Sequence, residues 1–207
     1  RLLKFFNSYD TNLNILILDS TPEDPNNIQL IKLLNKKEVN WVKFDYNVTY
    51  WERVARGSNL IETDYAVLCA DDDFIIPTAV GLCTNFLDEN LDYVSANGLY
   101  FTHPSLETYS KYGFAISEQY KGNNSAEQES ANERVHAYLS GKITTPRLYA
   151  VYRAETLKLI WRETAKYTSD WGLAEIFPCS LSYILGKAKN LPVFYSSREP
   201  NETVWYN

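Results

Sequence analysis

The sequence is poor in the residues that metal centres and disulfide frameworks use most. Among its 207 residues it has no methionine, two histidines and three cysteines. The two histidines, His103 and His136, argue against a histidine-based zinc site. The cysteines Cys69, Cys83 and Cys179 show no CxxC spacing, which is typical of reduced thiols in a cytosolic compartment. We therefore expect a cytoplasmic protein whose cysteines are reduced.

The sequence also lacks a basic excess and long apolar runs. Lys and Arg number 20 against 26 Asp and Glu, giving a net charge of -6, so the basic stripe of a nucleic-acid-binding protein is missing. No apolar segment approaches the roughly 20 residues of a transmembrane helix, and no signal peptide is visible. Hydrophobic residues make up 45%, so residues 1–207 should bury one core as a single domain.

The first residues have the pattern of an amphipathic helix. Residues 1–9 carry apolar side chains at helical spacing; these are Leu2, Leu3, Phe5 and Phe6. Since the sequence enters this helix directly at Arg1, we expect a short apolar strand to precede it in the natural protein.

Residues 65–77 are the stretch around which the rest is organised. An apolar run from Ala66 to Ala70 is followed by Asp71, Asp72 and Asp73. Such a run predicts a strand buried on both faces, with the acids at its C-terminal end, where open α/β sheets bind ligands. Three adjacent carboxylates repel one another, and a hard divalent cation shared with a phosphate would relieve this. The alternative is a solvated acidic turn.

The remaining pattern alternates strands and helices, which predicts a doubly wound, mostly parallel α/β sheet. Strands are expected over 13–20, 39–44, 65–70, 93–101, 148–153 and 188–195. Helices are expected over 28–35, 50–61, 78–89, 125–139, 154–164 and 171–185. The helix over 125–139 is expected because Ser125 and Gln128 have the spacing of a capping box. Residues 103–142 interrupt the alternation and form an insertion suited to acceptor recognition.

One helix carries two arginines on one side. Arg53 and Arg56 lie three residues apart in the helix that leads to the acidic stretch. A guanidinium fork matches phosphate oxygens, so Arg56 is a candidate for binding a diphosphate. A solvated helix face is the alternative.

Residues 70–77, Ala-Asp-Asp-Asp-Phe-Ile-Ile-Pro, resemble the DXD region of the GT-A glycosyltransferases, in particular the inverting, family-2-like group. The resemblance implies a GT-A fold whose first strand is missing from this chain. It also implies that the acids hold the ribose of a nucleotide-sugar donor and a Mn²⁺ or Mg²⁺ ion on its diphosphate. The alignment of the motif is open. Either Asp71 and Asp73 form the DXD pair, or Asp72 is the acid that faces the metal, so all three are candidates. Asp19, at the end of an earlier strand, matches the acid that binds the nucleotide in this family.

The resemblance extends to a helix with the pattern D-x-x-x-x-E that ends in Gly186-Lys187. Asp170 matches the general base of the family, and the ring of Trp171 is expected to shield it from water. Glu175 is the second candidate, on another side of the helix. Many family members have Glu-Asp where this chain has Ser169 before Asp170. Asp170 could alternatively serve only as a helix cap.

The implied function is the metal-dependent, inverting transfer of a sugar from a nucleotide-diphosphate sugar in surface polysaccharide biosynthesis. A UDP-sugar is the expected donor. Residues 1–101 would bind the donor and residues 102–207 a glycan or lipid-linked acceptor at the inner face of the membrane. Two other functions fit the acids. A haloacid-dehalogenase-like phosphatase also uses D-x-D after a strand, but the later Gly-Asp-x-x-x-Asp loop of that class is absent. A nucleotide-sugar-binding module without turnover is the other alternative.

Overall fold

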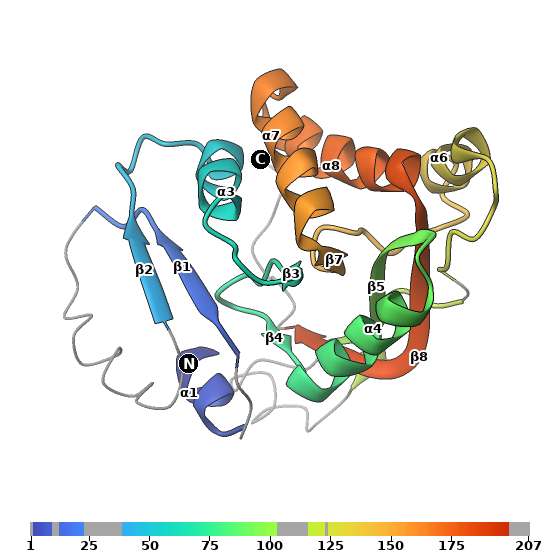
Figure 1. Cartoon of the computed structure of the whole chain (residues 1–207), viewed down its shortest axis with the longest axis horizontal. Coiled ribbons are helices and arrows are strands. Elements are labelled where there is room, and N and C mark those ends of the chain that lie inside the picture. Colours follow the sequence, from blue (N-terminus) through green and yellow to red (C-terminus); the bar gives the residue numbers. More distant parts are fainter. Residues whose placement is uncertain (1, 10–12, 23–38, 103–115, 123, 199–207) are drawn as a thin grey trace.

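A computed structural model shows the chain as a mixed α/β structure (Figure 1). It describes all residues except 1, 10–12, 23–38, 103–115, 123 and 199–207. The helices are α1 (Leu2–Asn7), α3 (Tyr50–Ser58), α4 (Pro77–Glu89), α6 (Ala131–Leu139), α7 (Ala154–Tyr167) and α8 (Trp171–Leu185). The strands are β1 (Ile15–Asp19), β2 (Val39–Lys43), β3 (Tyr65–Val67), β4 (Phe74–Ile75), β5 (Tyr93–Thr102), β6 (Ser117–Glu118), β7 (Val151–Arg153) and β8 (Lys187–Arg198). The helix expected over 28–35 lies outside the described residues.

The strands form two sheets of mixed direction. β1 and β2 pair in parallel as a two-stranded sheet, and a six-stranded sheet has the order β3-β7-β5-β8-β4, with β6 on β5. In the larger sheet only β5 and β8 pair in parallel, while the other described pairs are antiparallel. The expected mixture of helices and strands is confirmed, but the expectation of a mostly parallel sheet is wrong for this part of the chain. β7 lies between β3 and β5 and runs antiparallel to both.

Helices cover both faces of the larger sheet. Successive residues of a strand point to opposite faces, so Tyr152 packs with α3, α7 and α8, whereas Val151 packs with α4. Trp51 of α3 and Trp161 of α7 meet in the first of these clusters. On the other face, Leu87 of α4 is fully buried against the sheet. Both faces are therefore buried, as the near-continuous apolar strands predict.

Local sequence signals explain where two of the helices begin. Pro77 occupies the first turn of α4, where its missing N–H costs nothing and its fixed φ suits the helix. α3 begins with a capping box: the Glu52 N–H donates to the Thr49 side chain, and the Thr49 N–H donates to the Glu52 carboxylate at 3.2 Å. The Thr-x-x-Glu spacing of this box is visible in the sequence.

The helix expected to begin at Ser125 begins later, so that expectation is wrong. α6 starts at Ala131. Before it, Ala126 is fully buried and exchanges two backbone hydrogen bonds with Ala188 of β8, at 2.8 and 3.0 Å. This bridge holds the backbone extended at Ala126, which overrides the local capping pattern.

An apolar cavity of about 790 Å³ lies between the two sheets. Strands β1 and β3 form two of its walls, α3 and α4 contribute others, and Glu62 is the only charged residue among its lining residues. Within the described residues, β1 pairs only with β2 and β3 only with β7, so each strand turns an edge toward the cavity.

Two glycines, one in a helix and one in a strand, give opposite expectations for stability when alanine replaces them. A Cβ added at Gly81 in α4 would meet nothing within 4 Å, and alanine restricts the unfolded chain, so Gly81→Ala should stabilise by about 0.4–1 kcal/mol. A Cβ at Gly98 in β5 would meet the Val193 carbonyl oxygen at 2.5 Å and the Tyr195 Cβ at 2.8 Å, so Gly98→Ala should destabilise by about 1–3 kcal/mol. Urea unfolding of both variants tests this packing, and equal effects at the two sites would contradict it.

Candidate functional site

The three acids form a turn between β3 and β4, as the sequence predicts. The Asp73 N–H donates to the Ala70 carbonyl at 3.4 Å and closes this acidic turn. Asp71 and Asp72 are exposed, whereas Asp73 is only 7% exposed. Burial raises the pKa of Asp73, although the neighbouring Arg198 opposes this shift. The three carboxylates therefore have unequal surroundings.

An ion pair with Arg198 holds Asp73. The Arg198 Nε donates to Asp73 Oδ2 at 2.8 Å, and both side chains are largely buried. The antiparallel register of β4 and β8 pairs Phe74 with Ser197 and Ile75 with Ser196. Extending this register by one residue places Asp73 opposite Arg198 at the end of the ladder. Strand pairing therefore determines which arginine meets the acidic turn.

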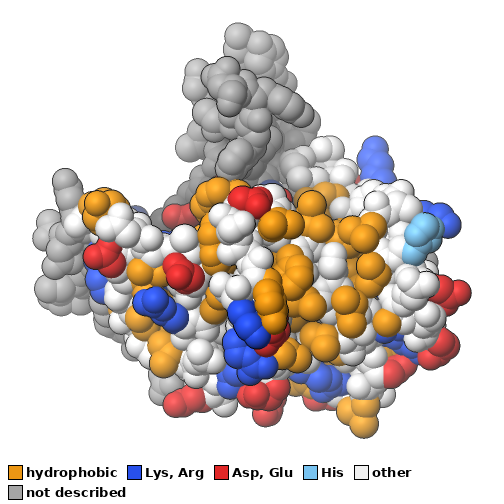
Figure 2. Space-filling view, turned by 90° about the horizontal axis from the view of Figure 1, so that it is seen from above, with side chains coloured by type: hydrophobic (Ala, Val, Ile, Leu, Met, Phe, Trp, Pro, Cys, Tyr) orange, Lys and Arg blue, Asp and Glu red, His pale blue; other side chains and the backbone are white. Residues whose placement is uncertain are grey.

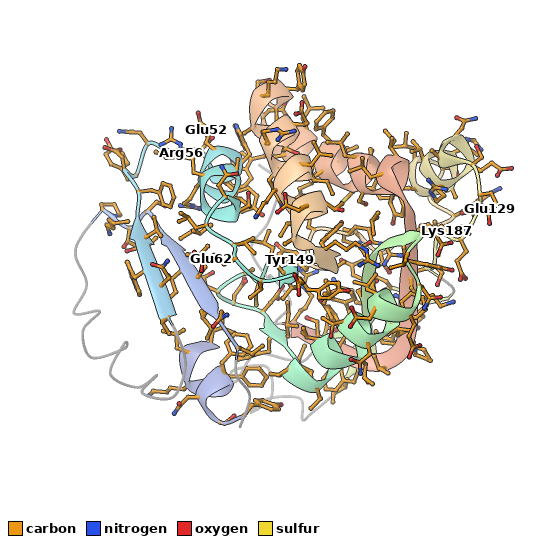
Figure 3. The ribbon with its side chains drawn as sticks, in the orientation of Figure 1. Glu52, Arg56, Glu62, Glu129, Tyr149 and Lys187 are labelled. Carbon is orange, nitrogen blue, oxygen red and sulfur yellow. The ribbon has the colours of Figure 1, made fainter. Side chains whose placement is uncertain are left out.

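Three tyrosines surround the Arg198 guanidinium. Arg198 Nη1 donates to the Tyr120 hydroxyl at 3.2 Å. The guanidinium carbon lies 4.9 Å from the ring centre of Tyr149 and 5.7 Å from that of Tyr100, as in cation–π contacts. Tyr149 lies near the centre of the molecule, below α7 (Figure 3). We call Asp73, Arg198 and these three tyrosines the Arg198 cluster.

The charge of Glu175 reaches the same cluster from α8. Burial raises the pKa of Tyr149 to about 12; Arg198 opposes the shift, and the carboxylates of Asp73, Asp72 and Glu175 add to it. Burial also raises the pKa of Tyr120, where Arg198 again opposes and Asp73 and Glu175 add to the shift. Such effects fade over roughly 10 Å in saline solution, so the charges of Glu175 and of Asp73 both act on Tyr149 and Tyr120.

Asp170 has a different environment from the one expected. It is the N-cap of α8, and its Oδ1 accepts a hydrogen bond from the Leu173 N–H at 3.0 Å. The carboxylate is exposed, and the Trp171 ring, itself 57% exposed, stacks on Tyr50 with ring centres 5.6 Å apart. The expectation that Trp171 shields Asp170 from water is therefore wrong. The general-base role of Asp170 stays a prediction.

Asp19 links the ends of β1 and β2. Its carboxylate accepts hydrogen bonds from the Thr21 N–H at 2.9 Å, the Thr21 hydroxyl at 2.7 Å and Lys43 Nζ at 2.9 Å. Burial alone would raise the pKa of Asp19, but the hydrogen bonds from Thr21 and the Lys43 charge outweigh it and lower the pKa. Asp19 thus has a structural role at this strand end, and its role in nucleotide binding stays a prediction.

Arg56 lies apart from the acidic turn. Figure 3 draws Arg56 and Glu52 at the outer end of α3, away from Tyr149. Hydrogen bonds from Thr49 lower the pKa of Glu52, and the Arg56 charge one turn further along adds to this. This placement is that of a solvated helix face, so the structure does not bring Arg56 to the other candidate residues.

α8 presents apolar side chains to solvent around Glu175. Trp171, Leu173 and Ile176 are exposed large apolar residues of its first turns, and Figure 2 shows apolar side chains gathered on the face that carries α7 and α8. In the described part of the chain, no helix has the length and apolar content needed to span a bilayer. Exposed apolar side chains of α8 therefore lie close to Glu175 in the helix.

Within the described residues, the acidic turn does not form a complete set of metal ligands. No group of three or more His, Cys, Asp or Glu side chains among the described residues is arranged to hold a metal ion. Mg²⁺ in nucleotide sites is usually held by one or two carboxylates together with substrate phosphates and waters. The exposed carboxylates of Asp71 and Asp72 fit that second arrangement, in which metal and diphosphate bind together.

Sequence reasoning found the acids and missed most of their partners. Arg198 and the tyrosines Tyr100, Tyr120 and Tyr149 were not expected, because they come from three distant segments that strand pairing brings together. A basic residue at the end of the last strand was the one available signal for Arg198. The 790 Å³ cavity lies elsewhere, since none of the three acids lines it.

Comparison with known proteins shows the fold. No protein-family model and no curated protein matches the sequence. A crystal structure of S. aureus TarS residues 1–349 superposes with a TM-score of 0.63 at 14% identity, over 96% of this chain. The same TarS segment in complex with UDP-GlcNAc gives 0.64 at 16% identity over 98% of the chain, and another TarS structure gives 0.61 at 15% identity over 96%.

The chain corresponds to only a part of each TarS chain. The chain spans 55% of the TarS 1–349 chain and 34% of the other TarS chain. At these identities the match shows the fold alone. The mixed α/β architecture, with a curled sheet flanked by helices, matches a glycosyltransferase fold, and the α/β fold expected from the sequence is confirmed with strands of mixed direction.

The ionisation of Asp19 should stabilise the fold in a pH-dependent way. A lowered pKa means that this stabilisation is present above the ordinary value of 3.8 and is lost as the pH falls through the folded-state pKa. Asp19→Asn should therefore cost about 1–3 kcal/mol at neutral pH, and the cost should shrink below about pH 4.

Urea unfolding over this pH range provides the measurement. Asp45→Asn is the matched control, because Asp45 is exposed and accepts one backbone hydrogen bond, from Asn47; it should change stability by no more than about 0.5 kcal/mol. A loss for Asp19→Asn that is the same at every pH would show that the charge of Asp19 contributes nothing.

Proposed function

We propose that the chain is the catalytic domain of a glycosyltransferase. It would move a sugar, with inversion, from a nucleoside-diphosphate sugar to a glycan or lipid-linked acceptor in surface polysaccharide biosynthesis. The observation that carries the proposal is the fold match, over 98% of the chain, to TarS in complex with UDP-GlcNAc. A UDP-sugar is therefore the first donor to test. The same match favours a transferase over a phosphatase.

The acidic turn is the proposed donor site. A diphosphate placed beside Asp71 and Asp72 would meet like charges, and this repulsion opposes binding unless a cation intervenes. Mn²⁺ or Mg²⁺ bound with the donor would neutralise the diphosphate as it leaves. Asp71 and Asp72 are exposed and can contribute oxygen ligands, while Arg198 and the tyrosine rings keep the turn in place.

Glu175 is the favoured general base, ahead of Asp170. In an inverting transfer the acceptor oxygen forms a bond to the anomeric carbon while the bond to the diphosphate oxygen breaks, and the leaving diphosphate keeps the electron pair. The acceptor proton must pass to a base on the opposite side of the sugar. The Glu175 charge acts on Tyr149 and Tyr120 together with the charge of Asp73, whereas Asp170 Oδ1 accepts the helix-capping hydrogen bond of the Leu173 N–H.

The surface beside Glu175 favours an acceptor that carries a lipid. Trp171, Leu173 and Ile176 expose apolar area on the same helix, and exposed apolar patches commonly mark interaction sites. A lipid-linked glycan could rest its apolar part there and present a hydroxyl to Glu175. Such an acceptor would place the enzyme at the inner face of the membrane.

Donor binding should depend on a divalent cation. In titration calorimetry, UDP should bind weakly in the presence of a chelator and at least about tenfold more tightly with Mn²⁺, because the cation removes the charge repulsion. Inorganic phosphate with Mn²⁺ serves as the control and should bind far more weakly than UDP. Equal affinity for UDP with and without Mn²⁺ would remove the acidic turn as the donor site.

Two variants of α8 separate the candidate bases. Glu175→Gln should lower sugar transfer by about 10²–10⁴-fold and leave UDP affinity unchanged, because the proposed base touches the acceptor. Asp170→Asn keeps a capping side chain and should transfer at close to the normal rate. Rates measured with a lipid-linked glycan acceptor decide this. Near-normal transfer by Glu175→Gln together with a collapse in Asp170→Asn would assign the base to Asp170.

A further inference from the structure

We propose that Trp171 is the platform on which a pyranose ring of the acceptor stacks, beside the residue that takes the acceptor proton. The inference rests on the proposed function and names the chemical class of the acceptor end, a sugar ring with a C–H-rich face. Trp171 is the first residue of α8, and its side chain is 57% exposed. Tryptophan is highly buried on average, so this exposure sets Trp171 apart from the buried Trp51 and Trp161.

Aromatic neighbours fix the orientation of the Trp171 ring. It stacks on Tyr50 with ring centres 5.6 Å apart and planes 19° apart, and it meets Trp51 edge-on at 5.9 Å. Tyr50 is itself anchored, because its ring packs at 90° against Trp161, which is 1% exposed. A planar ring has two faces. With one face against Tyr50, an exposure of 57% leaves the other face open to solvent.

An open and fixed indole face suits a sugar ring. The face of an aromatic ring carries partial negative charge, and the C–H groups on one side of a pyranose carry partial positive charge, so the two attract while the sugar hydroxyls stay in water. Tryptophan also offers a large and rigid contact area at low entropic cost. A ring that is already held in its binding orientation loses little freedom when a ligand arrives.

The geometry of α8 places Trp171 on the side of Glu175. At 3.6 residues per turn, these two residues lie about 40° apart around the helix axis, whereas Leu173 and Ile176 lie about 140° or more from Trp171. Burial raises the pKa of Tyr50, and the Glu175 charge adds to this shift, so Glu175 lies within electrostatic range of the ring on which Trp171 stacks. A sugar on Trp171 would present its hydroxyls beside Glu175 and leave Leu173 and Ile176 to the apolar part of the acceptor.

Fluorine NMR of protein labelled with fluorinated tryptophan tests sugar binding without the donor. The signal of residue 171 is assigned by its absence from the Trp171→Phe variant. Methyl β-D-glucopyranoside, which has C–H groups on both ring faces, should shift this signal saturably. Glucitol, which has similar hydroxyls but no ring, should not. The absence of a saturable shift with the glucoside, or an equal shift with glucitol, would overturn the platform.

Substitutions separate the open face from the packing of the ring. Trp171→Leu keeps an apolar side chain against Tyr50 but removes the flat face. It should raise KM for the lipid-linked glycan of the transfer assay at least about tenfold, with a much smaller change in kcat and no change in UDP affinity. Trp171→Phe keeps an aromatic face and should stay within about threefold of the wild-type KM. Ile184→Ala is the matched control and should leave KM unchanged, because Ile184 is 50% exposed on the same helix but lies about two and a half turns beyond Glu175.

The outcomes distinguish the platform from the proposed function. A saturable shift with the glucoside in a protein that shows neither Mn²⁺-dependent UDP binding nor sugar transfer would overturn the transferase function and leave the platform. Sugar transfer by the wild type, with no rise in KM for Trp171→Leu, would overturn the platform alone. Nucleobases also stack on aromatic side chains, so a loss of UDP affinity in Trp171→Leu at an unchanged acceptor KM would assign the ring to the donor and overturn this inference.

Discussion

The ion pair between Asp73 and Arg198 is the contact on which the candidate site depends. It joins the loop after β3 to the end of β8, so residues far apart in the sequence meet at one point. Burying either charge alone would cost several kcal/mol, and the guanidinium is further held by Tyr120 and Tyr149. The position of the acidic turn is therefore set by the pairing of β4 with β8 rather than by the turn sequence.

The same arrangement explains why α8 matters for the chemistry. Its N-terminus is fixed by Asp170, which caps the first turn, and by Trp171, which stacks on Tyr50 of α3. Burial raises the pKa of Tyr149 and Tyr120, two of the tyrosines beside Arg198, and the Glu175 charge on the same helix adds to this shift. In the proposed mechanism these two residues of one helix have separate roles: Asp170 caps the helix, and Glu175 takes the proton of the acceptor.

Sequence reasoning predicted the elements better than their pairing. Helices α4, α7 and α8 and the acidic turn fell where periodicity and the proline at residue 77 placed them. Strand direction was missed, because periodicity indicates burial and not the neighbour on either side. The helix start at residue 125 was missed because a bridge between Ala126 and Ala188 overrides the local capping signal. Arg198 was missed for the same reason: its importance comes from a register that only the folded sheet creates.

The most direct measurement is a crystal structure with UDP and Mn²⁺, with diffraction data collected at the manganese absorption edge. We expect one anomalous peak between the diphosphate and the carboxylates of Asp71 and Asp72, with Arg198 still paired to Asp73 and Glu175 facing the open side of the site. A manganese peak on Asp73 with Arg198 displaced would contradict the ion pair as the support of the acidic turn. A diphosphate bound away from the acidic turn would contradict the site as a whole.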